Sequence, residues 1–228
     1  MRDHGTLMKE ERKMEKKVLL TGFDPFGGDK VNPALEAVKQ LDGKNMEGIR
    51  IVTQQVPTVF HESIRTAAEA IEREKPDVVI CVGQAGGRTQ ITPERVAINI
   101  DDARIPDNQH HQPIDVPIEA DGPAAYWSTL PIKTITRQLR EAGIPAAVSN
   151  TAGTFVCNHL FYGVMHHLAK NNISARAGFI HVPYIPEQTT ETGAPSMSLE
   201  MIVKALEIAV FVSATIEKDL VETGGALH

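Results

Sequence analysis

Short apolar segments alternate along this chain with longer segments in which apolar residues recur at helical spacing. The first short segment, 17–23, begins after charged residues and ends beside glycine, the pattern of a buried strand. A glycine-rich loop follows at 24–28, and from Pro33 to Leu41 the apolar positions repeat every three or four residues. Asn32 stands where a helix cap is expected and Pro33 at the first helical position. The chain therefore opens with strand, loop and helix.

The same alternation continues to the end of the chain. Further strands are predicted near 49–56, 77–82, 146–149 and 177–182, and further helices near 59–74, 132–142, 155–170 and 198–220. The continuous β-branched run at 78–82 indicates a strand buried on both faces. Strands that alternate with helices predict an α/β fold: a three-layer α/β/α sandwich with a largely parallel, twisted central sheet.

Two segments depart from this rhythm. Four prolines interrupt residues 105–123, and we expect an ordered excursion or lid there, because a long structureless segment inside a compact domain is usually functional. Residues 1–13 are mostly polar and charged and precede a second methionine, Met14, which predicts a disordered N-terminal extension. Residues 14–228 are expected to form a single catalytic domain.

Charge and cysteine content narrow the function. The formal net charge of −6 comes without a basic cluster outside the extreme N-terminus, so we expect no nucleic-acid partner but a small neutral or peptide-like ligand. Two cysteines are too few for a disulfide scaffold or a zinc site. No apolar run approaches the roughly 20 residues that span a bilayer, and a signal peptide is not evident, so the protein is expected in the cytoplasm, away from membranes.

Cys157 is the candidate nucleophile. It follows a predicted strand and lies in the first turn of the next helix, where the helix N-terminus is expected to lower the pKa of the thiol. The alternative is a buried structural cysteine, which the position alone does not exclude. Cys81 lies inside the apolar run and is assigned to the core.

A cysteine nucleophile needs a base, and His181 is the best placed of nine histidines because it ends an apolar strand. A packed core histidine is the alternative for this residue. The other histidines are terminal, lie in the proline-rich excursion, begin a helix or share the helix of Cys157. A third, carboxylate member is expected from the segment 91–102, where Glu94, Asp101 and Asp102 remain equal candidates.

The glycine-rich segments do not resemble nucleotide loops. Residues 22–28 lack a Gly-Lys-Ser/Thr ending, and residues 83–88 lack the Gly-x-Gly-x-x-Gly spacing. Phe23 and Phe26 beside the first loop suggest the walls of a small apolar pocket, with core packing as the alternative. No His, Cys, Asp or Glu cluster has metal-ligand spacing, so a metal-free site is expected.

Several motifs together resemble the pyroglutamyl peptidase I family, also called pyrrolidone-carboxylate peptidases. They are Thr21-Gly-Phe-Asp-Pro-Phe-Gly-Gly28, Gly83-Gln-Ala-Gly-Gly-Arg88, Pro93-Glu-Arg-Val-Ala97, Ser149-Asn-Thr-Ala-Gly-Thr-Phe-Val-Cys-Asn158 and Phe179-Ile-His-Val-Pro-Tyr184. The resemblance implies a cytosolic cysteine peptidase that removes N-terminal pyroglutamate, with Glu94, Cys157 and His181 as its catalytic residues. It also implies an α/β/α fold, a homotetramer and no cofactor.

Pyroglutamate is a neutral lactam, so its site should combine flat apolar walls with a few hydrogen bonds. The expected walls are Phe23, Phe26, Phe155 and Val156. Gln84 and Asn32 are expected to meet the lactam or brace the loop. The backbone N–H of Cys157, together with Arg104, is expected to stabilise the oxyanion. A nucleoside phosphorylase-like transferase and a catalytically silent ligand-binding domain are the competing hypotheses.

Overall fold

The strand predicted first lies in the middle of a six-stranded sheet. The computed structural model describes residues 15–225, and the strand order in the sheet is β2-β3-β1-β4-β8-β5. The long strands are β1 (Lys16–Phe23), β3 (Ile49–Val56), β4 (Val78–Gln84) and β8 (Arg176–Val182), which pair in parallel. The short strands β2 (Asn45–Met46) and β5 (Thr92–Pro93) pair antiparallel at the two edges. The predicted α/β fold with a largely parallel sheet is confirmed.

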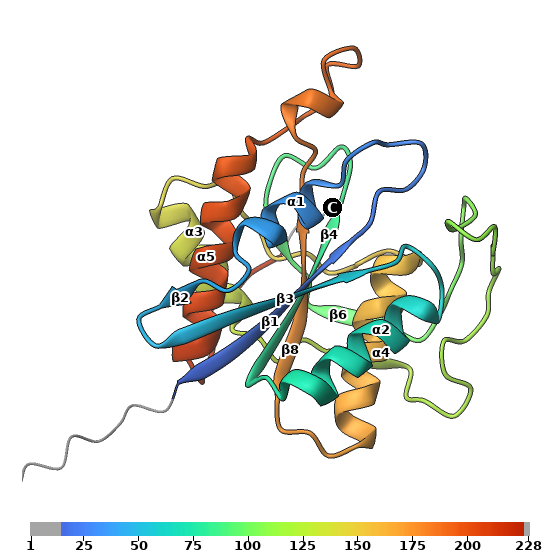
Figure 1. The fold of residues 1–228 in the computed structure, drawn as a ribbon, viewed down its shortest axis with the longest axis horizontal. Coiled ribbons are helices and arrows are strands. Elements are labelled where there is room, and N and C mark those ends of the chain that lie inside the picture. Colours follow the sequence, from blue (N-terminus) through green and yellow to red (C-terminus); the bar gives the residue numbers. More distant parts are fainter. Residues whose placement is uncertain (1–14, 226–228) are drawn as a thin grey trace, which may run out of the picture.

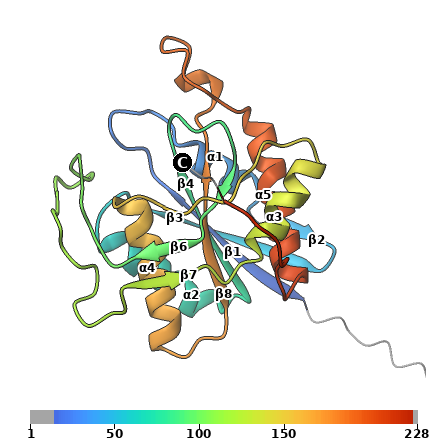
Figure 2. The same ribbon diagram turned by 180° about the vertical axis from the view of Figure 1, so that it is seen from behind.

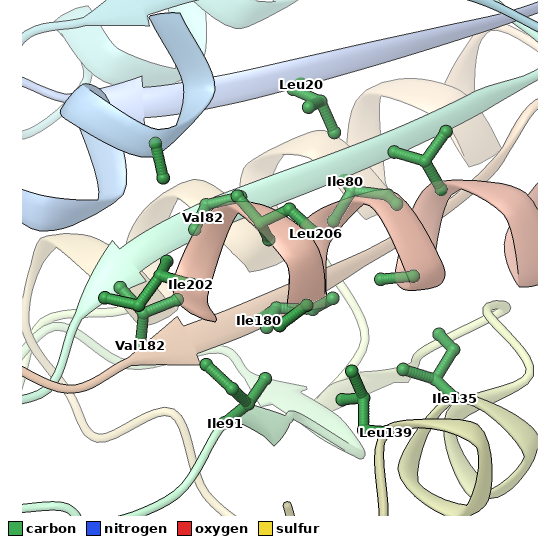
Figure 3. Packing of buried hydrophobic residues seen from close by; sticks show 14 of the residues in the cluster. Leu20, Ile80, Val82, Ile91, Ile135, Leu139, Ile180, Val182, Ile202 and Leu206 are labelled. Carbon is green, nitrogen blue, oxygen red and sulfur yellow. The ribbon is translucent and has the colours of Figure 1, made fainter. Parts of the chain in front are cut away.

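Helices cover both faces of this sheet (Figures 1 and 2). One face carries α1 (Pro33–Gln40), α3 (Ile132–Glu141) and α5 (Leu199–Thr215), and the other carries α2 (Glu62–Glu74) and α4 (Val156–Lys170). Successive strand residues point to opposite faces, so Ile80 and Ile180 join the first core (Figure 3) while Val79 and Phe179 join the second. Two apolar cores on one sheet produce the three layers.

The proline-rich excursion is held by hydrogen bonds rather than by regular structure. Residues 105–123 contain no helix or strand, and they lead from β6 (Val96–Ile98) to its antiparallel partner β7 (Ala125–Trp127). Asp101 and Val116 exchange two backbone hydrogen bonds, and the buried carboxylate of Asp107 accepts the backbone N–H groups of Gln109 and His111. The segment is ordered, as its length and position suggested.

Three predicted elements differ from the structure. Residues 146–149 form only isolated bridges to Ile91 and Glu94 instead of a strand. The second helix begins at Glu62 rather than near residue 59. The last helix ends at Thr215 rather than at residue 220, and Asp219 beyond it accepts the backbone N–H groups that open α3.

None of the helices among residues 15–225 has the length and apolarity needed to cross a bilayer. The expected N-terminal extension, residues 1–13, lies outside the described residues.

Candidate active site

The predicted chemical groups meet at one end of the sheet. β1, β4 and β8 run in parallel, so their carboxyl ends and the loops that follow them lie at the same edge (Figure 1). The N-terminal turn of α4 lies at this edge too, and Cys157 is the second residue of that helix. Parallel pairing thus gathers residues that are far apart in sequence.

His181 and Glu94 form a buried hydrogen-bonded pair. The short strand β5 pairs with β8 just before Glu94, whose backbone N–H donates to the Phe179 carbonyl at 2.8 Å. His181 Nδ1 lies 2.7 Å from Glu94 Oε1, and both side chains are almost completely buried. Because a carboxylate only accepts, Nδ1 carries the proton and Nε2 keeps a lone pair that can accept another.

The sulfur of Cys157 lies against the strand beside His181. Gly83 on β4 pairs with His181 on β8, and both face the layer that contains α4. A methyl group built on Gly83 would come within 2.9 Å of Cys157 Sγ, so the sulfur occupies the space that a side chain at position 83 would need. The sulfur therefore lies against the strand residue that pairs with His181.

The thiol pKa differs from the sequence expectation. Burial, with a further contribution from the negative charge of Glu94, raises the pKa of Cys157 to about 12, and the positive charge of Arg88 only partly opposes this. Burial also lowers the pKa of His181, although the hydrogen bond and charge of Glu94 act in the opposite direction. The prediction of a lowered thiol pKa was wrong, and desolvation by burial is the main cause of the raised value. Both shifts favour the neutral form of their group.

Arg88 is a site residue that the sequence reasoning missed. Its Nη1 lies 2.6 Å from Glu94 Oε1, the same oxygen that His181 contacts, and it also donates to Thr92 Oγ1. Burial favours a raised pKa for Glu94, but the hydrogen bond and charge of His181 and the charge of Arg88 hold this pKa below its usual range. Arg88 ends a motif from which only Gln84 was chosen as a site residue, and nothing in the spacing of the motif indicates the contact between Arg88 and Glu94.

The structure separates the three carboxylate candidates. Asp101 contacts a different imidazole, with Oδ2 2.8 Å from His159 Nδ1. Asp102 is exposed and contacts Thr154 through its backbone. Only Glu94 lies beside His181.

A small cavity adjoins the sulfur. It measures about 10 Å³, and its walls are Phe23, Phe26, Asn32, Thr58, Gln84, Phe155, Val156 and Cys157. All six residues predicted to bind substrate therefore surround one space, and Thr58 is an addition. Phe26 and Phe155 face one another with ring centroids 6.2 Å apart. The cavity has room for about one water molecule, so a ring-shaped ligand requires the walls to separate.

The two amide side chains in the cavity wall are already engaged. Asn32 Oδ1 accepts the Ala34 backbone N–H at 3.0 Å as the cap of α1, so this side chain braces the loop. Gln84 Nε2 donates to Asp29 Oδ2, and its Oε1 accepts from Gln188 Nε2 at 2.9 Å. A ligand would meet Gln84 in an orientation that these two neighbours set.

The remaining predictions concern Arg104 and metals. Arg104 is exposed and is not among the residues that line the cavity. Within residues 15–225, no group of three or more His, Cys, Asp or Glu side chains is arranged to hold a metal ion.

Substitution of Gly83 by alanine is expected to lower kcat about 100-fold by displacing the sulfur. The new Cβ would lie 2.7 Å from Phe179 Cζ and 2.9 Å from Cys157 Sγ, and Phe179 is fully buried. Steady-state kinetics and thermal unfolding measure the effect. The control is Gly224→Ala, where the nearest atoms are 3.6 Å away. A Gly83→Ala enzyme with wild-type kcat would mean that the sulfur position is not critical.

Comparison with known proteins agrees with the resemblance drawn from the motifs. The sequence profile of the Pyroglutamyl peptidase family matches residues 16–216. A pyrrolidone-carboxylate peptidase from Bacillus licheniformis is 64% identical over 214 residues, which cover 94% of this chain and 100% of the relative. One from Bacillus thuringiensis is 60% identical, with coverage of 93% and 100%.

Solved structures agree with these relatives. The crystal structure of pyroglutamyl peptidase I from Bacillus amyloliquefaciens superposes with a TM-score of 0.91 at 59% identity, covering 92% of this chain and 100% of that chain. A mutant pyrrolidone carboxyl peptidase from Pyrococcus furiosus has a TM-score of 0.84 at 45% identity, with coverage of 86% and 97%. The resemblance drawn from the motifs is confirmed, and the chain belongs to the pyroglutamyl peptidase family of cysteine peptidases.

Proposed function

We propose that this chain removes N-terminal pyroglutamyl residues from peptides, with Cys157 as nucleophile, His181 as base and Glu94 as the residue that orients the imidazole. The observation that carries the assignment is the contact between the Cys157 sulfur and Gly83, because the strand partner of Gly83 is the histidine that Glu94 contacts. A nucleophile, a base and an orienting group in this order are the arrangement that covalent acyl transfer needs.

The walls of the cavity fit the chemistry of the lactam. Phe23, Phe26 and Phe155 present aromatic surface, and the amide of Gln84 adds hydrogen-bonding capacity. No lysine, arginine, aspartate or glutamate lines this cavity, so it offers nothing to bind an ammonium group or a carboxylate. The neutral ring of pyroglutamate matches such a site once Phe26 and Phe155 separate.

The reaction begins as the Cys157 thiol transfers its proton to His181 Nε2 while the sulfur attacks the pyroglutamyl carbonyl carbon. The high pKa of Cys157, caused first by burial, makes proton transfer during attack the consistent route to the nucleophile. Glu94 stabilises the imidazolium and keeps its orientation, whereas the Arg88 cation disfavours the imidazolium but holds the Glu94 carboxylate in place. The imidazolium then protonates the departing amine as the C–N bond breaks, and water hydrolyses the remaining thioester.

Stabilisation of the oxyanion is assigned to backbone N–H groups in the first turn of α4. The backbone N–H groups of this turn have no partner within the helix, and Phe155 at the cap position has no side-chain acceptor for them. The N–H of Cys157 is therefore available for the oxygen that becomes negative. Arg104 is proposed as a second donor, and this role requires its exposed side chain to turn toward the cavity.

The activity is tested with a pyroglutamyl amide of a fluorescent amine. We expect fluorophore release that does not depend on phosphate and that stops after alkylation with iodoacetamide. A phosphorylase-like transferase would require phosphate and survive alkylation, and a silent binding domain would release no fluorophore.

We further propose that the chain is a single catalytic domain that assembles as a homotetramer and acts in the cytoplasm without a cofactor. The resemblance supports these assignments. Exposed apolar side chains at Ile114, Trp127 and Phe211 supply surface for contacts between subunits. Light scattering on the purified protein measures the assembled mass, and a monomer would contradict the tetramer.

Replacing Arg88 by glutamine is expected to move the acid limb of the pH profile of kcat/KM to higher pH. Burial is the first cause that lowers the pKa of His181, and the Arg88 cation acts in the same direction. Without this cation the imidazole stays protonated to higher pH and cannot accept the thiol proton. The maximal kcat/KM is expected to fall about tenfold, because Glu94 also loses a neighbour that holds its position.

The matched control is Arg65→Gln, which removes an arginine from exposed ion pairs with Glu62 and Glu69 on α2. This variant should keep the wild-type pH profile. If Arg88→Gln leaves the acid limb in place, or moves it to lower pH, Arg88 does not act on the imidazole.

A further inference from the structure

A strained turn lies behind the aromatic wall of the cavity. His61 has φ 61° and ψ −43°, and the Glu62 N–H donates to the Phe60 carbonyl at 2.7 Å across it. A bond between residues i and i+2 around a positive φ is a γ-turn of the rare, strained kind. An alanine-like or larger residue persists in this conformation only where its surroundings impose it.

Buried side chains hold His61 in this strained conformation. The backbone N–H of His61 donates to His159 Nε2 at 2.7 Å, and the N–H of Phe60 donates to Asp107 Oδ2 at 2.9 Å. His159 is fully buried in α4, two residues after Cys157. Because Nε2 accepts a hydrogen bond, the proton of this imidazole is on Nδ1, which donates to Asp101 Oδ2 at 2.8 Å.

The turn connects this imidazole to the cavity. The Phe60 ring makes edge contacts with both the His159 ring, at 5.2 Å between centroids, and the Phe155 ring, at 5.5 Å. Phe155 is one of the two aromatic walls that face each other across the cavity. Phe60 itself is 3% exposed, so its only surroundings are protein. A shift of the turn would move Phe60 and thereby change its packing against Phe155.

We propose that Asp101 and His159 are positioning residues for substrate binding, which hold the strained turn at His61 so that Phe60 supports Phe155 against the pyroglutamyl ring. The inference rests on the proposed function, because it assigns the cavity to that ring. Asp101 orients His159, His159 holds the turn, and Phe60 transmits the position to the wall. Neither Asp101 nor His159 takes part in proton transfer with Cys157.

The test compares His159→Leu with His159→Gln by steady-state kinetics on the pyroglutamyl fluorophore amide. Leucine fills the buried space but cannot accept the His61 N–H, so we expect KM to rise about tenfold while kcat stays within about threefold. Glutamine can both accept from His61 and donate to Asp101, so it should keep KM within about threefold of wild type. The rate of Cys157 alkylation by iodoacetamide should be unchanged in both variants.

Phe60→Leu provides a second route if His159→Leu does not fold, because it keeps the buried pair and removes only the ring contact. It should raise KM to a similar extent. His167→Gln, on a part of α4 remote from Cys157, is the control and should match wild type. Unchanged KM in the folded variants, or a fall in kcat alone, would overturn the inference. An inactive wild-type enzyme would instead contradict the proposed function.

Discussion

Alanine at position 157 is expected to lower kcat on a pyroglutamyl amide by about 10,000-fold or more, with the fold intact. The covalent route requires a sulfur that forms a thioester, and no other group takes this place. The partly buried side chain packs against Gly83, so its loss removes few contacts from the core. Circular dichroism and thermal unfolding establish that the variant is folded. The kcat is measured on a preparation that is free of contaminating wild-type enzyme.

Cys81 supplies the matched control. It is fully buried in β4, and burial raises its pKa to about 12, as it does for Cys157. Cys81→Ala should therefore lose about 1 to 2 kcal/mol of stability through the small cavity but retain wild-type kcat. Iodoacetamide should still inactivate the Cys81→Ala enzyme. Persistent turnover in Cys157→Ala would refute the nucleophile assignment.

His181→Ala is expected to lower kcat nearly as much, by about 1,000- to 10,000-fold. The thiol pKa, raised first by burial, leaves little thiolate at neutral pH, so attack depends on a base that removes the proton as the bond forms. Without the imidazole the departing amine also lacks a proton donor. The double variant of His181 and Cys157 should be little slower than either single variant, because the two residues act as a unit.

Alanine in place of His167, which is on the same helix as Cys157, is the control for the loss of a histidine. Its side chain contacts Glu72 on α2 near the protein surface, and its removal should leave kcat unchanged. A second result checks the base directly. In His181→Ala, the remaining rate should rise with pH as the thiol ionises without assistance, whereas a decrease of less than tenfold would indicate another base.

Local sequence signals predicted the elements that depend on local contacts. Pro33 begins α1 and Asn32 caps it because a fixed φ and a short polar side chain act within one turn. The apolar run 78–82 is a buried central strand, since only such a run tolerates helices on both faces. The start of α2 could not be predicted in this way. The helix begins only after the γ-turn at His61, whose N–H is bound by His159, 98 residues away.

In the candidate site, too, some features follow from local sequence and others only from contacts distant in sequence. His181 was chosen because it ends a strand, and the parallel pairing of β4 with β8 brings that end to the edge where the site lies. Cys157 was chosen because it follows a predicted strand, which forms only isolated bridges, although the residue does lie in the first turn of α4. Choosing among Glu94, Asp101 and Asp102 required either resemblance or coordinates, since Glu94 and Asp101 each contact a different imidazole that is distant in sequence.

The sequence by itself determined the four long strands and the five helices of residues 15–225, the edge at which the catalytic groups gather and, through its motifs, the family. These features follow from side-chain periodicity and from motifs, both of which lie in short segments of the chain. Only the tertiary structure decided that Arg88 shares an oxygen of Glu94 with His181, and that burial raises the pKa of the Cys157 thiol. Desolvation and charge depend on every atom packed around a group, so they exist only once the chain has folded.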